Sequence, residues 1–304
     1  MAKPIRIAGL LRRMPVARAA SKVLREVLLD LLEKIPEARN GDSKKAIHDL
    51  RVAVKRFREA FRLFRPVLRK KTFRKHREWI EDLNDALGEV RDRDVALGRL
   101  RKLAGGLGEA PASVAGLLER LESERLVAVG ALETFLKRLQ LEGVPAQLAG
   151  RIEALETQAG IGQPTYEFAR KRVLERLLAV RERWTSALRE ATPETMHRLR
   201  IANKRLRYAV EPFSRMLGKE VRRLYRAASR FHDLLGDLHD ADSMLVMIET
   251  SMAGASRPER RAWESLAVKV ARRRRVALRR VLSLADALEP LLDGAQHAVE
   301  EPAR

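Results

Sequence analysis

Residues 43–58 read SKKAIHDLRVAVKRFR, and residues 192–207 read TPETMHRLRIANKRLR. Each stretch has a histidine followed by an arginine, a lysine and an arginine at the same spacing, and the copies lie 149 residues apart. A second block follows each copy at an offset of 148 residues: LNDALGEVRDRD at 83–94 and FHDLLGDLHDAD at 231–242. Matched blocks in the same order predict an internal duplication.

The spacing of the apolar residues predicts an all-α chain. Apolar positions recur every three or four residues, alternating strand patterns are missing, and aromatic residues make up only 5% of the chain. Leu, Ala, Arg and Glu, which favour helices, dominate the composition. A third block, KVLREVLL at 22–29, resembles RVLERLLA at 172–179, so we expect each half to contain about four helices.

The positions of the repeats and of the Gly and Pro breakers predict the domain organisation. We expect a first helical-bundle repeat at 15–140 and a second at 164–295, joined by a linker at 141–163, with an N-terminal extension at 1–14 and a C-terminal tail at 296–304. By analogy with symmetric oligomers, duplicated units commonly pack about a pseudo-twofold axis. The expected fold is therefore two pseudo-symmetric four-helix bundles that form one unit with a basic central groove.

The charge balance indicates a polyanionic partner. The chain carries 62 Lys and Arg against 41 Asp and Glu, a formal net charge of +21. Such a surface repels itself, so it is typical of proteins that bind nucleic acid, an acidic membrane or a phosphate polymer. The chain has no cysteine and no apolar run of the roughly 18 residues that span a bilayer, and residues 1–22 contain no apolar stretch long enough for a signal peptide. We therefore expect a cytoplasmic protein with no membrane partner.

The cations of both repeated stretches fall on one stripe of their helix. At about 100° per residue they share one arc, whereas apolar residues such as Leu50 and Phe57 occupy another. Basic stripes are usually solvated faces, but this one is duplicated, and the nearby acids Asp49 and Glu59 fall outside it. The stripes and the basic segments after them give the candidate binding residues: His48, Arg51, Lys55, Arg58, Arg62, Arg74, His197, Arg200, Lys204, Arg207, Arg222 and Arg226.

The expected starts of the two motif helices also favour an anion. Ser43 and Thr192 are suitable N-caps, and Pro193 suits the first helical position. The motif histidines then lie near the first turns, where the helix carries partial positive charge. A phosphate chain could contact the helix start and then the row of cations.

The repeated aspartates have two interpretations. The Asp residues of RDRD (91–94) and DAD (240–242) could pair with arginines and cap a helix that ends after Gly88 or Gly236, or they could hold Mg²⁺ together with phosphate. We favour the structural interpretation, because each pair lies at a predicted helix break. Neither motif histidine has a His, Asp or Glu three or four residues later. We therefore predict no metal and no cofactor.

Four segments resemble the motifs of the CHAD family, the conserved-histidine α-helical domain. They are HDLRVAVKRFREAFRLF (48–64), ALGEVRDRDV (86–95), HRLRIANKRLRYAVEPF (197–213) and LLGDLHDAD (234–242), and the resemblance extends over about residues 15–295. It implies two pseudo-symmetric four-helix bundles. It also implies binding of inorganic polyphosphate along a basic central surface, with association to polyphosphate granules in some members.

The resemblance assigns the site residue by residue. The family's histidine falls on His48 and His197, and its basic positions fall on Arg51, Lys55, Arg58, Arg200, Lys204 and Arg207. The two copies differ after these positions, because Arg62 aligns with Glu211 and Arg65 aligns with Ser214. We therefore expect a more positive surface on the first half. The ExExK motif of the triphosphate hydrolases that accompany some relatives is missing.

The prediction is non-enzymatic binding of inorganic polyphosphate, and two alternatives stay open. A metal-dependent all-α phosphohydrolase could use the dipeptides His232-Asp233 and His239-Asp240, but it needs a further His and Asp beside them. A nucleic-acid-binding protein would have a similar charge. However, base recognition needs exposed aromatic or amide side chains, which the stripes lack, so we expect nucleic acid only as a non-specific competitor.

Overall fold

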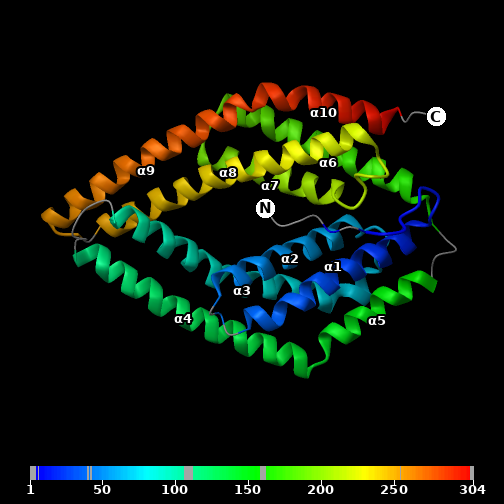
Figure 1. Ribbon diagram of the computed structural model, residues 1–304, viewed down its shortest axis with the longest axis horizontal. Helices are drawn as coiled ribbons and strands as arrows, with labels where there is room; N and C mark the ends of the chain where they lie inside the picture. Colours follow the sequence, from blue (N-terminus) through cyan, green and yellow to red (C-terminus); the bar gives the residue numbers. More distant parts are fainter. Residues whose placement is uncertain are drawn as a thin grey trace. The chain divides into compact units, whose positions relative to one another are not determined.

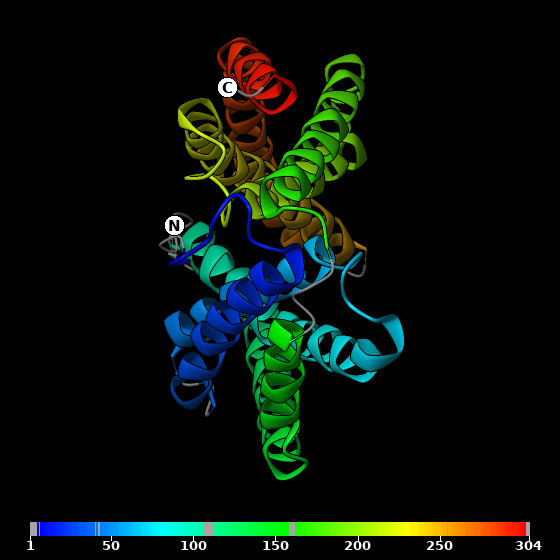
Figure 2. The same cartoon turned by 90° about the vertical axis from the view of Figure 1, so that its right-hand side faces the viewer.

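The computed structural model describes residues 5, 7–39, 41, 43–105, 112–157, 162–253 and 255–301. Over these ranges the chain consists of helices and the turns between them, which confirms the all-α prediction (Figures 1 and 2). One isolated backbone bridge joins Pro15 and Pro164 within the described part. No helix among these residues combines the length and the apolar character needed to cross a bilayer.

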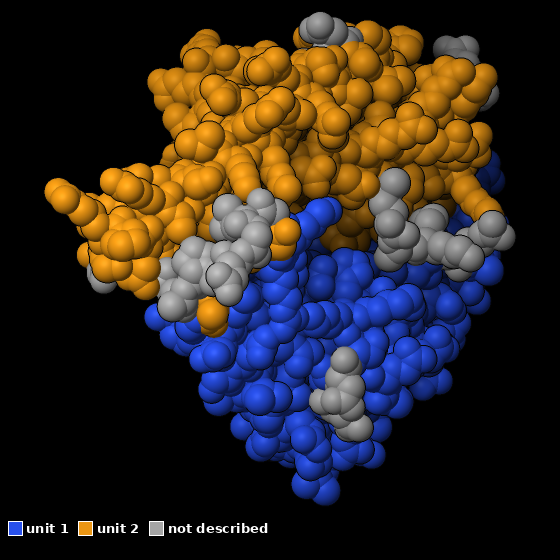
Figure 3. Space-filling model, turned by 60° about the vertical axis from the view of Figure 1, so that its left-hand side comes forward, with its two compact units in different colours: residues 1–102, 116–168 blue, residues 103–115, 169–304 orange. Residues whose placement is uncertain are grey.

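The chain divides into two compact units, coloured separately in Figure 3. Unit 1 comprises residues 1–102 and 116–168, and unit 2 comprises residues 103–115 and 169–304. The helices of the first half are α1 (Val16–Ala38), α2 (Lys44–Leu63), α3 (Lys70–Ala104), α4 (Ala112–Leu141) and α5 (Val144–Thr157). Those of the second half are α6 (Thr165–Arg189), α7 (Pro193–Val210), α8 (Lys219–Met252), α9 (Arg257–Ser283) and α10 (Ala285–Glu300).

The described part of each half has five helices, one more than the four that we expected in each bundle. The fifth helix of the first half, α5, occupies most of residues 141–163, the segment expected to be a linker. It buries Leu148, Ile152 and Leu155 and packs against α1. These three apolar residues lie on one helical face, and burying that face favours a packed helix over an extended connection. The matching order and similar lengths of the two sets of helices support the predicted duplication.

The motif helices begin and pack as their sequences predict. The Ser43 hydroxyl accepts a hydrogen bond from the Ala46 amide at 3.1 Å, and the Thr192 hydroxyl accepts one from the Thr195 amide at 3.2 Å. Each cap satisfies a backbone donor that has no partner inside its helix. The arc of α2 that includes Leu50 and Phe57 is fully buried. In α2 the apolar arc therefore faces inward, whereas the residues of its cationic arc are exposed or half-buried.

The long helices α3 and α8 run without interruption through the glycines at which we expected a break. α3 continues past Gly88 to Ala104, and α8 continues past Gly236 to Met252. A Cβ atom added at Gly88 would lie 2.8 Å from Nη1 of Arg51, whereas one added at Gly236 would meet nothing within 4 Å. Gly88 therefore makes room for an arginine of the motif helix and does not end α3.

Candidate functional site

In unit 1 the motif histidine lies at the surface near a cation of the following long helix. His48 on α2 is exposed. Partial burial of its ring, followed by the positive charges of Arg91 on α3 and of Lys55, lowers the pKa of His48, while Asp49 opposes the shift. The site therefore holds a neutral imidazole near two cations, an environment that favours an incoming anion.

Arg51 is held in place by α3. Its Nη2 lies 3.4 Å from Oδ1 of Asp92, and its Nη1 lies 3.4 Å from the carbonyl oxygen of Asn84. Only 17% of its side chain is exposed, and the guanidinium packs where Gly88 has no side chain. An arginine fixed in this way loses little side-chain entropy when it binds a phosphate oxygen.

Arg58 and Arg62 of the first row are paired with acids, contrary to our expectation. Nη1 of Arg58 lies 2.9 Å from Glu81, and Arg62 contacts Glu59 at 3.0 Å and Glu81 at 3.2 Å. Glu81 belongs to α3, so the arcs of α2 considered alone could not reveal it. The predicted scarcity of neutralising acids is therefore wrong for this row.

The second motif histidine lies beside another histidine. His197 on α7 is exposed, and its ring centroid lies 4.9 Å from that of His239 on α8. Burial and then the charges of Arg200 and Lys204 lower the pKa of His197. Burial and then Arg200 and His197 lower the pKa of His239, while nearby aspartates oppose the shift. His239 aligns with Arg91 at the 148-residue offset, so each motif histidine has a basic neighbour from the same position of the repeat.

The remaining residues of the second row differ in exposure. Lys204 is buried, with only 7% of the residue exposed, whereas we expected a surface cation, and its participation in binding stays a prediction. The guanidinium carbon of Arg207 lies 4.5 Å from the ring centroid of Tyr208, which is itself buried. A cation in this position is stabilised by the ring.

A serine replaces the neutralising glutamate in the second half. Ser229 aligns with Glu81 at the 148-residue offset, and its hydroxyl donates to the Tyr225 carbonyl of its own helix at 2.9 Å. The additional cation of the first half, Arg62, is paired with two glutamates. We expected the first half to have the more positive surface because of Arg62. That reason fails, because two glutamates neutralise Arg62.

Three predicted residues lie on the long helices. Arg74 on α3 is exposed and lies 3.6 Å from Glu78, and Arg222 and Arg226 are exposed one turn apart on α8. A solvated pair such as Arg74–Glu78 contributes little to stability, so it opens readily for another anion. The participation of these three arginines stays a prediction.

The last aspartate of each repeat pairs with an arginine of the next helix. Oδ1 of Asp94 lies 2.7 Å from Nε of Arg125 on α4, and Oδ1 of Asp242 lies 2.5 Å from Nε of Arg274 on α9. The Asp94 carboxylate is fully buried, and Arg125 also donates to the Gly41 carbonyl at 2.6 Å. These pairs favour the structural interpretation of the aspartates. The aspartates lie in the middle of α3 and α8, however, and not at the helix ends that we expected. Among the described residues no group of three or more His, Asp or Glu is arranged to hold a metal ion.

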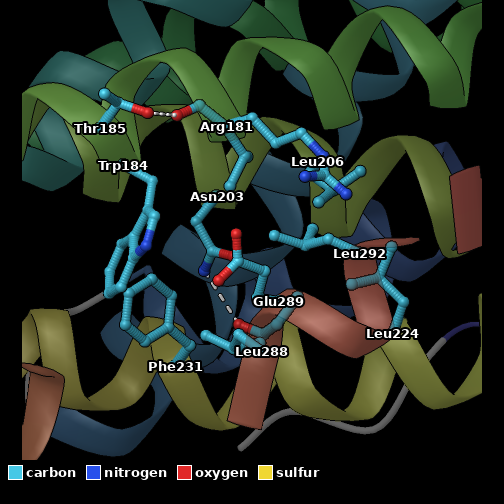
Figure 4. A pocket seen from close by; sticks show the side chains of 12 residues that line it. Arg181, Trp184, Thr185, Asn203, Leu206, Leu224, Phe231, Leu288, Glu289 and Leu292 are labelled. Atoms are coloured by element: carbon cyan, nitrogen blue, oxygen red, sulfur yellow. Dashed lines mark hydrogen bonds between the residues drawn. The ribbon is translucent and has the colours of Figure 1, made fainter. Parts of the chain in front are cut away.

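A pocket in unit 2 lies on the other side of α7. Asn203 and Leu206 line it together with Trp184 and Phe231, and the Asn203 amide donates to the Ala228 carbonyl at 2.9 Å (Figure 4). Asn203 and Leu206 are buried residues of the core-facing arc of α7. The pocket is therefore a packing feature of the interior and does not belong to the row of cations.

The comparisons with known proteins identify the family. The family model described as the CHAD domain matches residues 22–249, which is more than half of the chain. The chain belongs to the CHAD domain family. Polyphosphate binding is a general property of this family, so the CHAD assignment gives the chain a polyphosphate-associated role.

Two solved structures share the CHAD fold. The crystal structure of the CHAD domain from the plant Ricinus communis matches with a TM-score of 0.60 and 21% identity, over 100% of this chain and 98% of that chain. PptA from Streptomyces chartreusis matches with a TM-score of 0.59 and 15% identity, over 90% of this chain and 99% of that chain. At these identities the likeness shows the fold alone. No curated protein matches the sequence.

Replacing Gly88 by alanine tests the packing of Arg51. The new Cβ would lie 2.8 Å from Nη1 of Arg51, so the guanidinium must move and polyphosphate affinity should fall about tenfold, the effect of one charge-assisted hydrogen bond. Gly236→Ala is the matched control, because its Cβ meets nothing and the change only favours the helix. Affinity is measured by fluorescence anisotropy with labelled polyphosphate. Equal affinities of the two variants would contradict the role given to Arg51.

Proposed function

We propose that this protein binds inorganic polyphosphate through the cations around its two motif histidines, and that it does not alter the polymer. The observation that supports this most is the repeated arrangement of a surface histidine, a basic neighbour from the following long helix, and a motif arginine. In unit 1 these are His48, Arg91 and Arg51, and in unit 2 His197, His239 and Arg200 take the equivalent positions. Family membership supports the choice of ligand. Binding at granules, as in some relatives, is part of the proposal.

The chemistry of these residues suits a chain of phosphates. An arginine can donate two parallel hydrogen bonds to phosphate oxygens, and an imidazolium can donate one or two more. Every repeat of the polymer offers the same anionic oxygens, so no base or sugar has to be recognised. Tyr208, the aromatic residue beside the second row, is buried beneath Arg207 and does not offer a stacking face. This disfavours recognition of single-stranded nucleic acid.

Binding without catalysis is supported by the use of the carboxylates. Asp94, Asp242 and Glu81 are paired with arginines of neighbouring helices. Carboxylates engaged in this way are poor ligands for a divalent ion and poor general bases. We therefore propose a binding protein and not a phosphohydrolase. Release of orthophosphate in the presence of Mg²⁺ or Mn²⁺ would contradict this part of the proposal.

The proposed function is tested by binding polyphosphates of graded length at several salt concentrations. Many weak contacts along one chain should make long polymers bind far more tightly than triphosphate. Affinity should fall steeply with salt, because phosphates that are neutralised by the protein release their counterions. Single-stranded RNA is the competitor at fixed salt. Tighter binding of RNA than of polyphosphate of the same charge would favour the nucleic-acid alternative.

The motif histidines should make binding stronger in acid. The pKa values of His48 and His197 lie below the ordinary 6.5 in the free protein, so both rings are neutral at pH 7.5. A bound polyanion favours the charged ring, so protons are taken up on binding and affinity rises as the pH falls below about 6.5. Anisotropy titrations between pH 7.5 and 5.5 at constant ionic strength measure this rise. The triple variant H48Q/H197Q/H239Q should bind with little dependence on pH. A wild-type affinity that is constant over this range would contradict the prediction.

A further inference from the structure

The net positive charge of the second half is concentrated on α9, a helix outside the motifs. α4 and α9 occupy the same place in the two sets of helices, each following the long helix of its half. α4 contains four Lys and Arg and four Glu, whereas α9 contains ten Lys and Arg and two Glu. The charges of α4 are also paired along the helix, as in Lys137–Glu133 and Arg120–Glu124. The fold therefore does not require a basic helix at this position.

The packing of α9 separates its core face from its charged face. Its buried residues are Trp263, Leu266, Val270, Ala277 and Val281, and they share one face of the helix. The helix packs against α8 and α10, and Arg274 at the edge of this face reaches Asp242 of α8. The arginines elsewhere on the helix are exposed: Arg257, Arg260, Arg261, Arg272, Arg273, Arg275, Arg279 and Arg280.

Four of these arginines form a row, which we call the α9 row: Arg261, Arg272, Arg275 and Arg279. At 100° per residue they lie within about 60° of arc, opposite the buried face, and they extend over about 27 Å of the helix. Among the described residues no ion pair joins any of the four to a carboxylate. Like charges at this spacing repel one another, so the row is destabilising until an anion binds.

The α9 row is distinct from the motif cations of unit 2. Both α7 and α9 pack against α8, and Arg274 marks the side of α9 that faces α8. The row lies about 100° to 160° around the helix from Arg274. It therefore points away from α8, and a polymer on this row contacts a different surface from one at His197 and His239.

The side chains within the row indicate the kind of anion. The exposed apolar residues there are Val268 and Val276, and no exposed aromatic residue or leucine accompanies them among the described residues of α9. Stacking on nucleic-acid bases needs aromatic rings, and insertion into a membrane surface needs larger apolar side chains. What remains is a dense set of guanidinium groups, which match phosphate oxygens in pairs.

We propose that the α9 row is a second polyphosphate-binding surface, so that one protein molecule holds two polymer segments and links chains together. This inference rests on the proposed function, because the polymer is the same. A molecule with two polymer sites cross-links long chains and gathers them into a dense phase, whereas a molecule with one site only coats them. The α9 row then adds a polymer contact to those made by the motif cations of the two units.

The experiment compares three forms of the full chain: the wild type, the row variant R261Q/R272Q/R275Q/R279Q, and a control, R18Q/R25Q/K171Q/R189Q, that removes as many exposed charges elsewhere. Calorimetry with a polyphosphate of about ten phosphates measures the number of chains bound, and turbidity with a long polyphosphate measures cross-linking. The row variant should bind one chain fewer than the wild type, and its remaining affinity should change less than about threefold. Its turbidity should fall at least tenfold, while the control behaves as the wild type.

Each other outcome is decisive. A row variant with the stoichiometry and turbidity of the control would overturn the second surface and leave the proposed function intact. A wild type that binds no polyphosphate at all would overturn the proposed function itself. If the row variant loses affinity for RNA but keeps every polyphosphate chain, α9 is a nucleic-acid surface and the inference is wrong.

Discussion

Replacing Arg51 and Arg200 together by glutamine is expected to weaken the binding of long-chain polyphosphate about 100-fold. Each arginine contributes about 1.5 kcal/mol through charge-assisted hydrogen bonds, so the pair contributes about 3 kcal/mol, which is a factor of about 100 in affinity. Arg51 is already fixed by Asp92 and Asn84, so it should contribute the larger share of this loss. Fluorescence anisotropy at constant salt measures the change, and the salt dependence of the affinity should become less steep as well.

The matched control for this pair is R25Q/R189Q, which removes the same charge from exposed positions of α1 and α6. It should weaken binding less than about threefold, through the smaller net charge alone. Circular dichroism should show the same helix content in both double variants. If the two variants bind equally well, the motif arginines are not the site and only the overall charge attracts the polymer.

Replacing Asp94 by alanine is expected to lower the free energy of unfolding by about 3 kcal/mol. The change leaves the largely buried guanidinium of Arg125 without its carboxylate, and breaking a buried pair in this way costs about 3–5 kcal/mol. The contact between Arg125 and the Gly41 carbonyl remains, which favours the lower end of the range. Urea unfolding followed by circular dichroism measures the change.

Two further variants show whether the pair itself is responsible. The double variant D94A/R125L removes both charges, so most of the lost stability should return. Asp82 is exposed on the same helix, and D82A should change the free energy of unfolding by less than about 0.5 kcal/mol. If D94A destabilises the protein only in the presence of Mg²⁺, the aspartate is a metal ligand and the structural interpretation is wrong.

The features that could be predicted from the sequence are those that one helix determines alone. The caps at Ser43 and Thr192 and the buried arc of Leu50 and Phe57 depend on local spacing, which the sequence displays directly. The repeat also predicted that equivalent residues serve equivalent roles. His48 and His197 indeed lie in similar basic surroundings.

The features that escaped prediction depend on contacts between helices. Glu81 neutralises Arg58 from another helix, and Arg125 reaches Asp94 across 31 positions of the sequence. Lys204 lies on the predicted stripe, yet it is buried. The segment at 141–163 contains four glycines and a proline, which suggested a linker, but the packing of the apolar face of α5 decides its structure. In each case the sequence did not reveal which helices pack against one another.

The first turn of α6 has a consequence for how the chain can be divided. The Thr165 hydroxyl donates to the Met14 carbonyl at 2.6 Å, and Phe168 stacks on Phe64 with ring centroids 5.4 Å apart. This turn therefore belongs to the core of unit 1, whereas the rest of α6 belongs to unit 2. A cut before it would strip unit 1 of a core aromatic ring, and a cut after it would remove the start of α6. We therefore expect that neither half is stable when the chain is cut at this helix, and that an isolated half needs residues 165–168.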